Sequence, residues 1–114
     1  MRICIDIDGT ICELKNYIGS YEEVRPLPGF IQFVKYRKSL GDEIILYTAR
    51  HMKTCDGNVG KVVARKGLEL LNWLDKYHIP YDEIYFGKPQ ADVYIDDNAL
   101  TFDGNWYPFM NLSP

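Results

Sequence analysis

The chain has 114 residues, of which 46% are hydrophobic and 25% charged, and its formal net charge is −3. This length suits one domain with a single core, the acidic balance argues against nucleic acid as a partner, and the composition is ordinary for a globular protein. No apolar run approaches the ~20 residues of a transmembrane helix, and no signal-peptide pattern opens the chain. Its three cysteines form no C-x-x-C motif. Together these features favour a single cytoplasmic domain over residues 1–114 with no membrane partner.

The chain opens on a short apolar run that ends in two carboxylates. Residues 3–7 are mostly β-branched, which is typical of a strand that is covered on both faces in a parallel sheet. Asp6 and Asp8 close this strand, and strand alternation sends both side chains to the same side of the sheet. Gly9 allows a sharp turn after the second carboxylate. Because ligands of open α/β sheets bind beyond the carboxyl ends of the strands, this pair lies where chemistry is usually done.

The aspartate pair has a catalytic and a structural interpretation. Two carboxylates this close repel each other unless a cation lies between them, and Mg²⁺ prefers such oxygen ligands. The structural alternative is a turn, since Asp-Gly is a common hairpin signal. The residues after Thr10 do not form a second alternating strand at hairpin distance, which favours the catalytic interpretation.

A strand–helix–strand unit comes next in the chain. Residues 11–27 have no clear period and predict an irregular segment, or small flap, over the end of the first strand. The apolar spacing of residues 29–40 predicts a helix. Its expected inner face consists of Phe30, Phe33, Val34 and the stem of Arg37. Residues 43–48 form the second buried strand, and this order makes a right-handed parallel crossover that places Thr48 beside the two aspartates.

The second half of the chain predicts a long helix and two more strands. Residues 50–58 form a polar loop, and residues 59–77 form the helix. Its expected inner face consists of Val62, Val63, Leu70, Leu71 and Leu74. Short strands over 83–86 and 92–95 come after it, and residues 102–114 are expected to be loop with one short strand or helical turn.

Each of the four predicted strands ends in polar residues of a distinct kind. After the aspartate pair come Thr48, then Lys88, then Asp96 and Asp97. In a parallel sheet these groups converge on one rim and form an acidic pocket for a hard cation, with a hydroxyl and an ammonium beside it. Such a site suits phosphoryl transfer, and a carboxylate is a competent nucleophile at phosphorus. Taken singly, each residue also has a structural use: strand end, solvated lysine or helix N-cap pair.

These residues, in this order, resemble the four motifs of the haloacid dehalogenase superfamily of phosphohydrolases. The motifs match at Asp6-x-Asp8-Gly9-Thr10, Thr48, Lys88 and Asp96-Asp97. More narrowly, the turn 48–50 and the stretches 57–61 and 87–89 resemble the small phosphatases encoded with capsule polysaccharide genes. The resemblance implies a three-layer, Rossmann-like α/β sandwich with a mostly parallel sheet of four to five strands. No insertion is long enough for a cap domain, so the implied protein is capless.

The resemblance also implies a role for each motif residue. Asp6 is the nucleophile, and Asp8 is the general acid and base, whose backbone carbonyl also reaches Mg²⁺. Thr48 donates to the transferring phosphoryl group, and Lys88 steadies both that group and Asp6. The implied metal ligands are Asp6, Asp8, Asp96 and Asp97, with Asp97 favoured over Asp96 as the direct ligand.

Two further residues belong to the expected substrate site, Ala49 and Arg50 in the turn after the second strand. Arg50 either grips a second anionic group of the substrate by two hydrogen bonds or pairs with a carboxylate of the chain, and the sequence leaves both interpretations open.

The leading interpretation is a Mg²⁺-dependent phosphomonoester hydrolase that forms an aspartyl-phosphate from a small phosphorylated metabolite, with phosphosugars among the candidates. A phosphotransferase or phosphomutase of the same superfamily is the nearest rival, since the intermediate can pass its phosphoryl group to an alcohol. A receiver-like signalling module is disfavoured, because the second strand ends in Thr-Ala-Arg with no phosphoacceptor Asp. The identity of the substrate and association into a homo-oligomer stay open.

Overall fold

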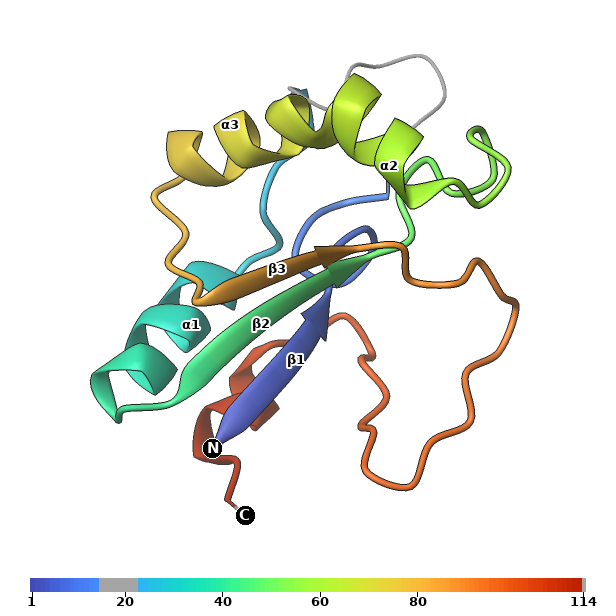
Figure 1. The fold of residues 1–114 in the computed structure, drawn as a ribbon. Coiled ribbons are helices and arrows are strands. Elements are labelled where there is room, and N and C mark those ends of the chain that lie inside the picture. The colour runs from blue at the N-terminus through green and yellow to red at the C-terminus, as the bar shows by residue number, and fades with distance from the viewer. Residues whose placement is uncertain (15–22, 114) are drawn as a thin grey trace.

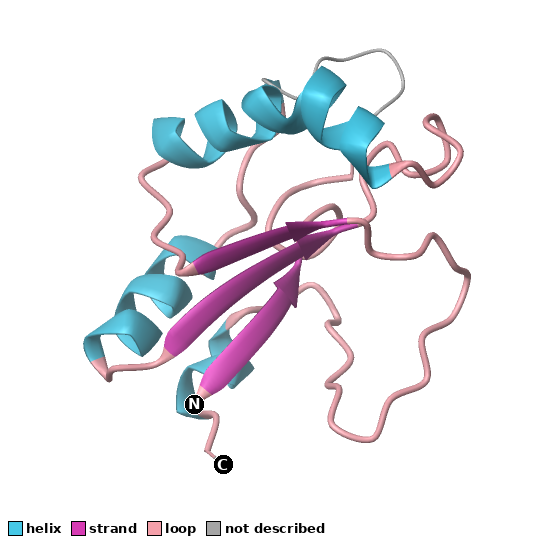
Figure 2. Ribbon diagram, in the orientation of Figure 1, coloured by secondary structure: helices cyan, strands magenta, loops and turns pink. Residues whose placement is uncertain are grey.

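A computed structural model describes residues 1–14 and 23–113 of the chain. Within them, three parallel strands form one sheet in the order β1-β2-β3. These strands are β1 (Arg2–Asp6), β2 (Glu43–Thr48) and β3 (Glu83–Phe86), and helical segments connect them (Figures 1 and 2). The chain is therefore an α/β protein with a parallel sheet, as its pattern of apolar segments predicts.

The connections between the strands are helical. Helix α1 (Phe30–Ser39) joins β1 to β2. A longer helix joins β2 to β3 and consists of α2 (Val59–Val62), a π-helical turn η2 (Val63–Gly67) and α3 (Leu68–Lys76). A short 3₁₀ helix, η3 (Tyr107–Asn111), lies near the C-terminus. The two helices predicted over 29–40 and 59–77 are confirmed, and so is the helical turn in the last stretch of the chain.

The helices cover one face of the sheet. Right-handed crossovers in a sheet of this strand order place α1 and α3 on the same face. We call this the covered face; it carries the strand residues that join the core, Ile3, Ile5, Ile44, Leu46, Ile84 and Phe86. We call the other face the open face; it carries the alternate residues, Arg2, Cys4, Asp6, Glu43, Ile45, Tyr47, Glu83 and Tyr85.

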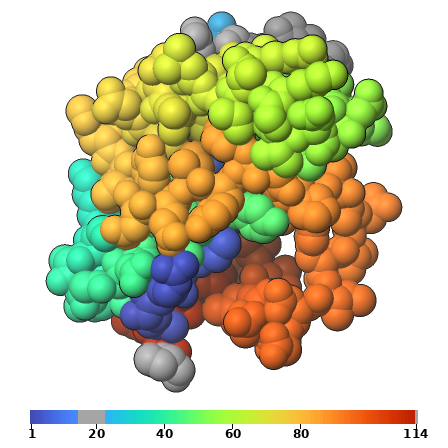
Figure 3. Space-filling model, in the orientation of Figure 1, coloured from blue at the N-terminus to red at the C-terminus, as the bar shows by residue number. Residues whose placement is uncertain are grey.

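The open face looks toward the viewer in Figures 1 and 3, and no helix crosses it there. Cys4 and Tyr85 on this face are exposed. Arg2 bridges it with ion pairs of 2.6 Å to Glu43 and 2.8 Å to Glu83. The predictions of a first strand covered on both faces and of a three-layer sandwich are therefore wrong for the described residues, which form two layers.

The predicted fourth strand is absent from the described part of the chain. Residues 92–95 adopt no strand, and the loop over 87–105 extends away from the sheet (Figure 1). Tyr94 closes this loop locally, because its hydroxyl donates to the Pro89 carbonyl and accepts from the Ala91 N–H at 3.3 Å. Ile95 is 96% exposed. Local side-chain hydrogen bonds thus replace the strand pairing that the apolar run predicts.

The long helix presents a partly different inner face from the predicted one. Val62, Leu70 and Leu74 are buried as expected, whereas Val63 and Leu71 are exposed. Trp73 is buried in their place, with its indole N–H donating to the carbonyl of Val24 at 2.8 Å. The π-helical turn begins at Val63 and contains more residues than an α turn, so it changes which of the later residues face the sheet.

The inner face of α1 agrees with its prediction, since all four expected residues are buried. Trp106 packs against this face, with ring centroids 5.1 Å from Phe30 and 4.7 Å from Phe33. Its indole N–H donates to the carbonyl of Thr10 at 2.8 Å, which ties the C-terminal segment to the turn after β1.

Most of the predicted flap over 11–27 lies outside the described residues, including its expected anchors Tyr17, Ile18 and Tyr21. Its two described ends run side by side, with a hydrogen bond of 2.9 Å from the Leu27 N–H to the Ile11 carbonyl. Among the described helices, none combines the length and the apolar character that a bilayer span would need.

Candidate functional site

Asp6 is held at the carboxyl edge of the sheet by two donors. It ends β1, its side chain lies on the open face and is 33% exposed, and its backbone is in register with Tyr47 of β2. The Thr10 hydroxyl donates to Oδ2 at 3.0 Å, and the Lys88 Nζ lies 3.2 Å from Oδ1. The turn after β1 returns Thr10 to this position, since the Thr10 N–H donates to the Ile7 carbonyl at 3.1 Å. The carboxylate is thus accessible and held in place.

Lys88 reaches Asp6 from the turn after β3. Its N–H donates to the Thr48 carbonyl at 3.1 Å, which fixes this turn beside the end of β2. Its Nζ also lies 4.3 Å from the centre of the Tyr94 ring. A cation over an aromatic face is attracted by the ring, so Lys88 is positioned from two sides.

Asp8 is clamped by Arg50. The Arg50 Nε lies 3.1 Å from Oδ2 of Asp8, and its Nη2 lies 2.8 Å from Oδ1, a two-point contact between guanidinium and carboxylate. The Arg50 side chain is 3% exposed and that of Asp8 is 22% exposed. Of the two interpretations of Arg50 that the sequence leaves open, the geometry corresponds to the pair with a carboxylate of the chain.

Thr48 lies beneath this edge rather than on its surface. Only 1% of the residue is exposed, and its Oγ1 accepts the Arg50 N–H at 2.9 Å. The next residue, Ala49, accepts the Met52 N–H at 3.0 Å through its carbonyl. In this arrangement Thr48 orders the turns that carry Arg50 and Lys88, and its hydroxyl lies away from solvent.

Cys12 packs below Asp8, with its Sγ 3.7 Å from Oδ1. Burial, followed by the negative charge of Asp8, raises the pKa of the Cys12 thiol to about 12. The thiol is therefore protonated at neutral pH and unreactive.

The structure does not bring Asp96 and Asp97 to Asp6 and Asp8. Both residues are exposed in the loop over 87–105, where Oδ1 of Asp96 accepts the Asn98 N–H at 3.3 Å. Within residues 1–14 and 23–113, no three His, Cys, Asp or Glu side chains gather as a metal site would require. The predicted rim is thus assembled for the first and third motifs, whereas Thr48 of the second motif lies beneath it and Asp96 and Asp97 of the fourth lie away from it.

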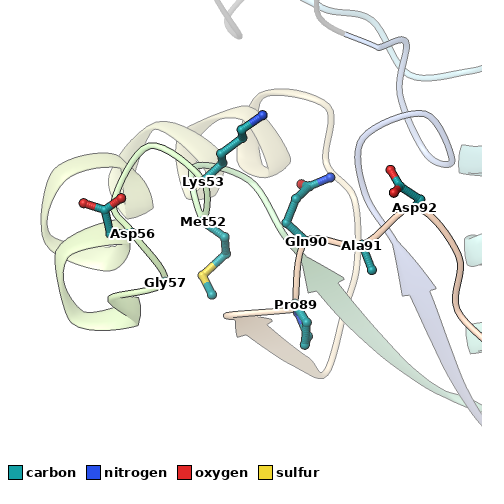
Figure 4. A pocket seen from close by; sticks show the side chains of 8 residues that line it. All are labelled: Met52, Lys53, Asp56, Gly57, Pro89, Gln90, Ala91 and Asp92. Carbon is teal, nitrogen blue, oxygen red and sulfur yellow. The ribbon is translucent and has the colours of Figure 1, made fainter.

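A pocket of about 580 Å³ lies beside this edge, between the loop after β2 and the loop after β3 (Figure 4). Its lining consists of Met52, Lys53, Asp56, Gly57, Pro89, Gln90, Ala91 and Asp92. The two loops that form it begin next to Arg50 and Lys88, so the pocket adjoins the residues that hold the two aspartates.

Some contacts of the site could not be expected from the sequence. Thr10 belongs to the first motif, but only the folded turn shows that its hydroxyl donates to Asp6. The apolar pattern places Tyr94 in a strand, and nothing in that pattern indicates its contact with Lys88.

Neither a protein-family model nor a curated protein matches the chain. Among solved structures, the crystal structure of an MCSG target from Vibrio cholerae is similar to it, with a TM-score of 0.84 and 35% sequence identity. The match covers 98% of this chain and 89% of the Vibrio cholerae chain. The chain therefore belongs to the same protein family as that target. This likeness shows family and fold, and no activity comes with it.

Proposed function

We propose that the chain is a phosphomonoester hydrolase of the haloacid dehalogenase superfamily that acts on a small phosphorylated metabolite. The observation that carries the proposal is the placement of Asp6. Its accessible carboxylate contacts Lys88 and Thr10 at the carboxyl edge of a parallel sheet, and Asp8 is fixed two residues later by Arg50. A nucleophile, a cation and a second carboxylate in this arrangement suit phosphoryl transfer.

In the first step, a carboxylate oxygen of Asp6 attacks phosphorus, and the bond from phosphorus to the ester oxygen breaks. Protonated Asp8 gives its proton to that oxygen, so the product leaves as an alcohol. An ionised carboxylate has about four lone-pair sites and Arg50 occupies two of them, so a proton can bind at a remaining site while Arg50 keeps Asp8 oriented. The ammonium of Lys88, 3.2 Å from Asp6, offsets negative charge on the phosphoryl oxygens.

In the second step, water attacks the phosphorus of the aspartyl-phosphate. Asp8, now ionised, takes a proton from this water as the new bond forms. The bond between phosphorus and the Asp6 oxygen breaks, inorganic phosphate leaves, and both aspartates return to their starting forms. Asp8 thus acts first as acid and then as base.

Magnesium is also part of the proposal. In this structure, however, the described residues are not arranged as a magnesium site requires. Asp6 and Asp8 are each paired with a cationic side chain, and Asp96 and Asp97 lie exposed on the loop. A magnesium site at this edge would need Asp96 or Asp97 to move to the rim, because Mg²⁺ requires several oxygen ligands in octahedral geometry. Both steps of the reaction accordingly use only side chains of the chain.

The nucleophile is tested by Asp6→Asn, with hydrolysis of p-nitrophenyl phosphate as the assay. We expect wild-type turnover and a loss of at least about 1000-fold in the variant, since an amide is a poor nucleophile. Asp75→Asn, an exposed aspartate on α3, is the matched control and should keep full activity. Equal release of phosphate and alcohol identifies a hydrolase rather than a phosphotransferase. Full activity of a folded Asp6→Asn would end the proposal.

The metal is tested by removing it. If Asp96 or Asp97 moves to the rim and completes a magnesium site, EDTA should abolish turnover of p-nitrophenyl phosphate and Mg²⁺ should restore it. The double variant Asp96→Asn/Asp97→Asn should lose this Mg²⁺-dependent activity, with Asp103→Asn in the same loop as the control. Wild-type turnover that is unchanged in EDTA would remove magnesium from the proposal and leave the Asp6 chemistry standing.

A further inference from the structure

We propose that Tyr94 is a positioning residue for the reaction, because its ring holds the Lys88 ammonium beside Asp6, the carboxylate that attacks phosphorus. This inference rests on the proposed function and adds to it a residue that lies outside the four motifs. Tyr94 follows Lys88 by six residues in the loop over 87–105, and its ring centre lies 4.3 Å from the ammonium.

The Lys88 ammonium needs a contact that does not depend on Asp6. A lysine side chain is a flexible four-carbon stem that carries a point charge, so a single partner does not fix its direction. In the described part of the chain, this ammonium contacts the Asp6 carboxylate at 3.2 Å and the Tyr94 ring. A phosphoryl group that binds at Asp6 competes for the first contact and leaves the second intact. The ring contact therefore keeps the charge at the rim while the substrate binds.

Tyr94 is itself fixed by the turn that carries Lys88. Its hydroxyl donates to the Pro89 carbonyl and accepts the Ala91 N–H at 3.3 Å. The turn is fixed in its own place, since the Lys88 N–H donates to the Thr48 carbonyl at 3.1 Å. Both partners of the ring contact are thus attached to backbone groups beside the rim, and their relative position is set by the fold of this turn.

The alternative role of Tyr94 is to close the loop through its hydroxyl, with no effect of the ring on Lys88. The two roles are separable by substitution, because phenylalanine keeps the ring and loses both hydrogen bonds, whereas leucine loses the ring as well. Tyr94 is 50% exposed, and the attraction between a cation and an exposed ring is modest. The expected effect on turnover is accordingly limited in size.

The first experiment measures steady-state hydrolysis of p-nitrophenyl phosphate by Tyr94→Leu and Tyr94→Phe. We expect kcat of Tyr94→Leu to fall by about threefold to tenfold while KM changes by less than about twofold. Tyr94→Phe should stay within about twofold of the wild-type kcat, because it keeps the ring. Tyr36→Leu on α1, where the tyrosine is 40% exposed, is the matched control and should keep wild-type kinetics. A thermal melt of each variant checks the fold.

Each other outcome of this experiment overturns a named part of the argument. Wild-type kcat in Tyr94→Leu, or equal falls in Tyr94→Leu and Tyr94→Phe, would overturn the positioning role and leave the hydrolase standing. A rise in kcat would also overturn it, since the ring contact would then hold Lys88 away from its working position. No turnover by the wild type would overturn both this inference and the proposed function.

The second experiment tests whether Tyr94 acts through Lys88 by a double-mutant cycle with Lys88→Met. Changes that act through one group are not additive, so removal of the ring should have no further effect once the ammonium is absent. We expect kcat of Lys88→Met/Tyr94→Leu to equal that of Lys88→Met within about 1.5-fold. Assays at high enzyme concentration keep these slow variants measurable. A further fall of about threefold or more would show that Tyr94 acts on another group, and would overturn the inference.

Discussion

At the scale of single residues, the two aspartates that are one residue apart have separate cationic partners. Lys88 contacts Asp6, and Arg50 contacts Asp8 at two points. The repulsion that the sequence predicts between two close carboxylates is thus offset by side chains of the described chain. These contacts also differ in kind, because Lys88 is a point charge and Arg50 is a planar fork that fixes the orientation of its partner.

The orienting role of Arg50 is tested by Arg50→Lys. Lysine keeps the positive charge and loses the two-point contact, so Asp8 is no longer held at the angle that proton transfer needs. We expect kcat for p-nitrophenyl phosphate to fall by about 10- to 100-fold while KM changes by less than about threefold. Steady-state kinetics measure both, and a thermal melt checks the fold.

The matched control for this variant is Arg65→Lys, an exposed arginine in η2, which should keep wild-type kinetics. A folded Arg50→Lys with wild-type kcat would show that Arg50 has no part in orienting Asp8. A rise in KM alone would instead favour the other interpretation of Arg50, a direct contact with an anionic substrate group.

At the scale of elements, the turn after β3 is fitted closely to the start of α2. Gly87 has a φ of 95°, and a Cβ at this position would lie 2.7 Å from the Val59 Cγ2. No side chain fits at that distance without movement of its neighbour. Since the next residue is Lys88, the packing of this turn against α2 also sets where the ammonium lies relative to Asp6.

Gly87→Ala should therefore destabilise the protein through both backbone strain and contact. Gly41→Ala is the matched control, because Gly41 has a φ of 87° and nothing lies within 4 Å of its added Cβ. We expect a loss of about 1–2 kcal/mol for Gly41→Ala, from the left-handed conformation alone. Gly87→Ala should lose about 1–3 kcal/mol more, from the close contact.

Urea unfolding measures the free energy of unfolding of each variant. Adding Val59→Ala to Gly87→Ala removes the close contact and should recover most of the difference between the two glycine variants. Equal losses at Gly87 and Gly41 would show that Val59 moves aside without cost.

The elements that the sequence predicts correctly are those defined by local patterns. Residues 43–48 and 83–86 are apolar runs bounded by turn residues, and their strands appear at these positions. The strand expected over 92–95 depends on pairing with an edge of the sheet that is distant in sequence. The competing contacts of Tyr94 cannot be inferred from the apolar pattern. For the same reason the predicted rim forms at Asp6, Asp8 and Lys88, whose strands are present, and not at Asp96 and Asp97.

At the scale of the whole molecule, a buried ionic cluster joins the two ends of the chain to the core. Arg37 of α1 donates to Asp42 at 2.6 Å and to the carbonyl of Leu112 at 2.9 Å. The ammonium of Met1 donates to the same Asp42 at 2.6 Å. Sequence periodicity places Arg37 on the inner face of its helix, but its partners are 5 to 75 residues away and only the fold identifies them.

This cluster and a second carboxylate, Asp82, make the free energy of unfolding depend on pH in the acid range. The hydrogen bond from the N-terminal ammonium, and after it the Arg37 guanidinium, hold the pKa of Asp42 below its ordinary value against the opposing effect of burial. Lys38 and the N–H of Ile44 do the same for the pKa of Asp82. A carboxylate whose pKa is lowered by folding contributes stability above its unfolded pKa, about 3.9, and loses it as the pH falls through the folded value.

We therefore expect the free energy of unfolding of the wild type to fall steadily as the pH is lowered from about 5 to 2. Asp42→Asn should be less stable than the wild type at pH 7, because Arg37 and the Met1 ammonium lose their charged partner, yet it should lose less stability over the acid range. Urea unfolding at several pH values measures both, with Asp75→Asn as the exposed control. If Asp42→Asn and the wild type lost equal stability between pH 5 and pH 2, the acid sensitivity would have to come from carboxylates other than Asp42, because a residue that no longer titrates cannot contribute to the slope.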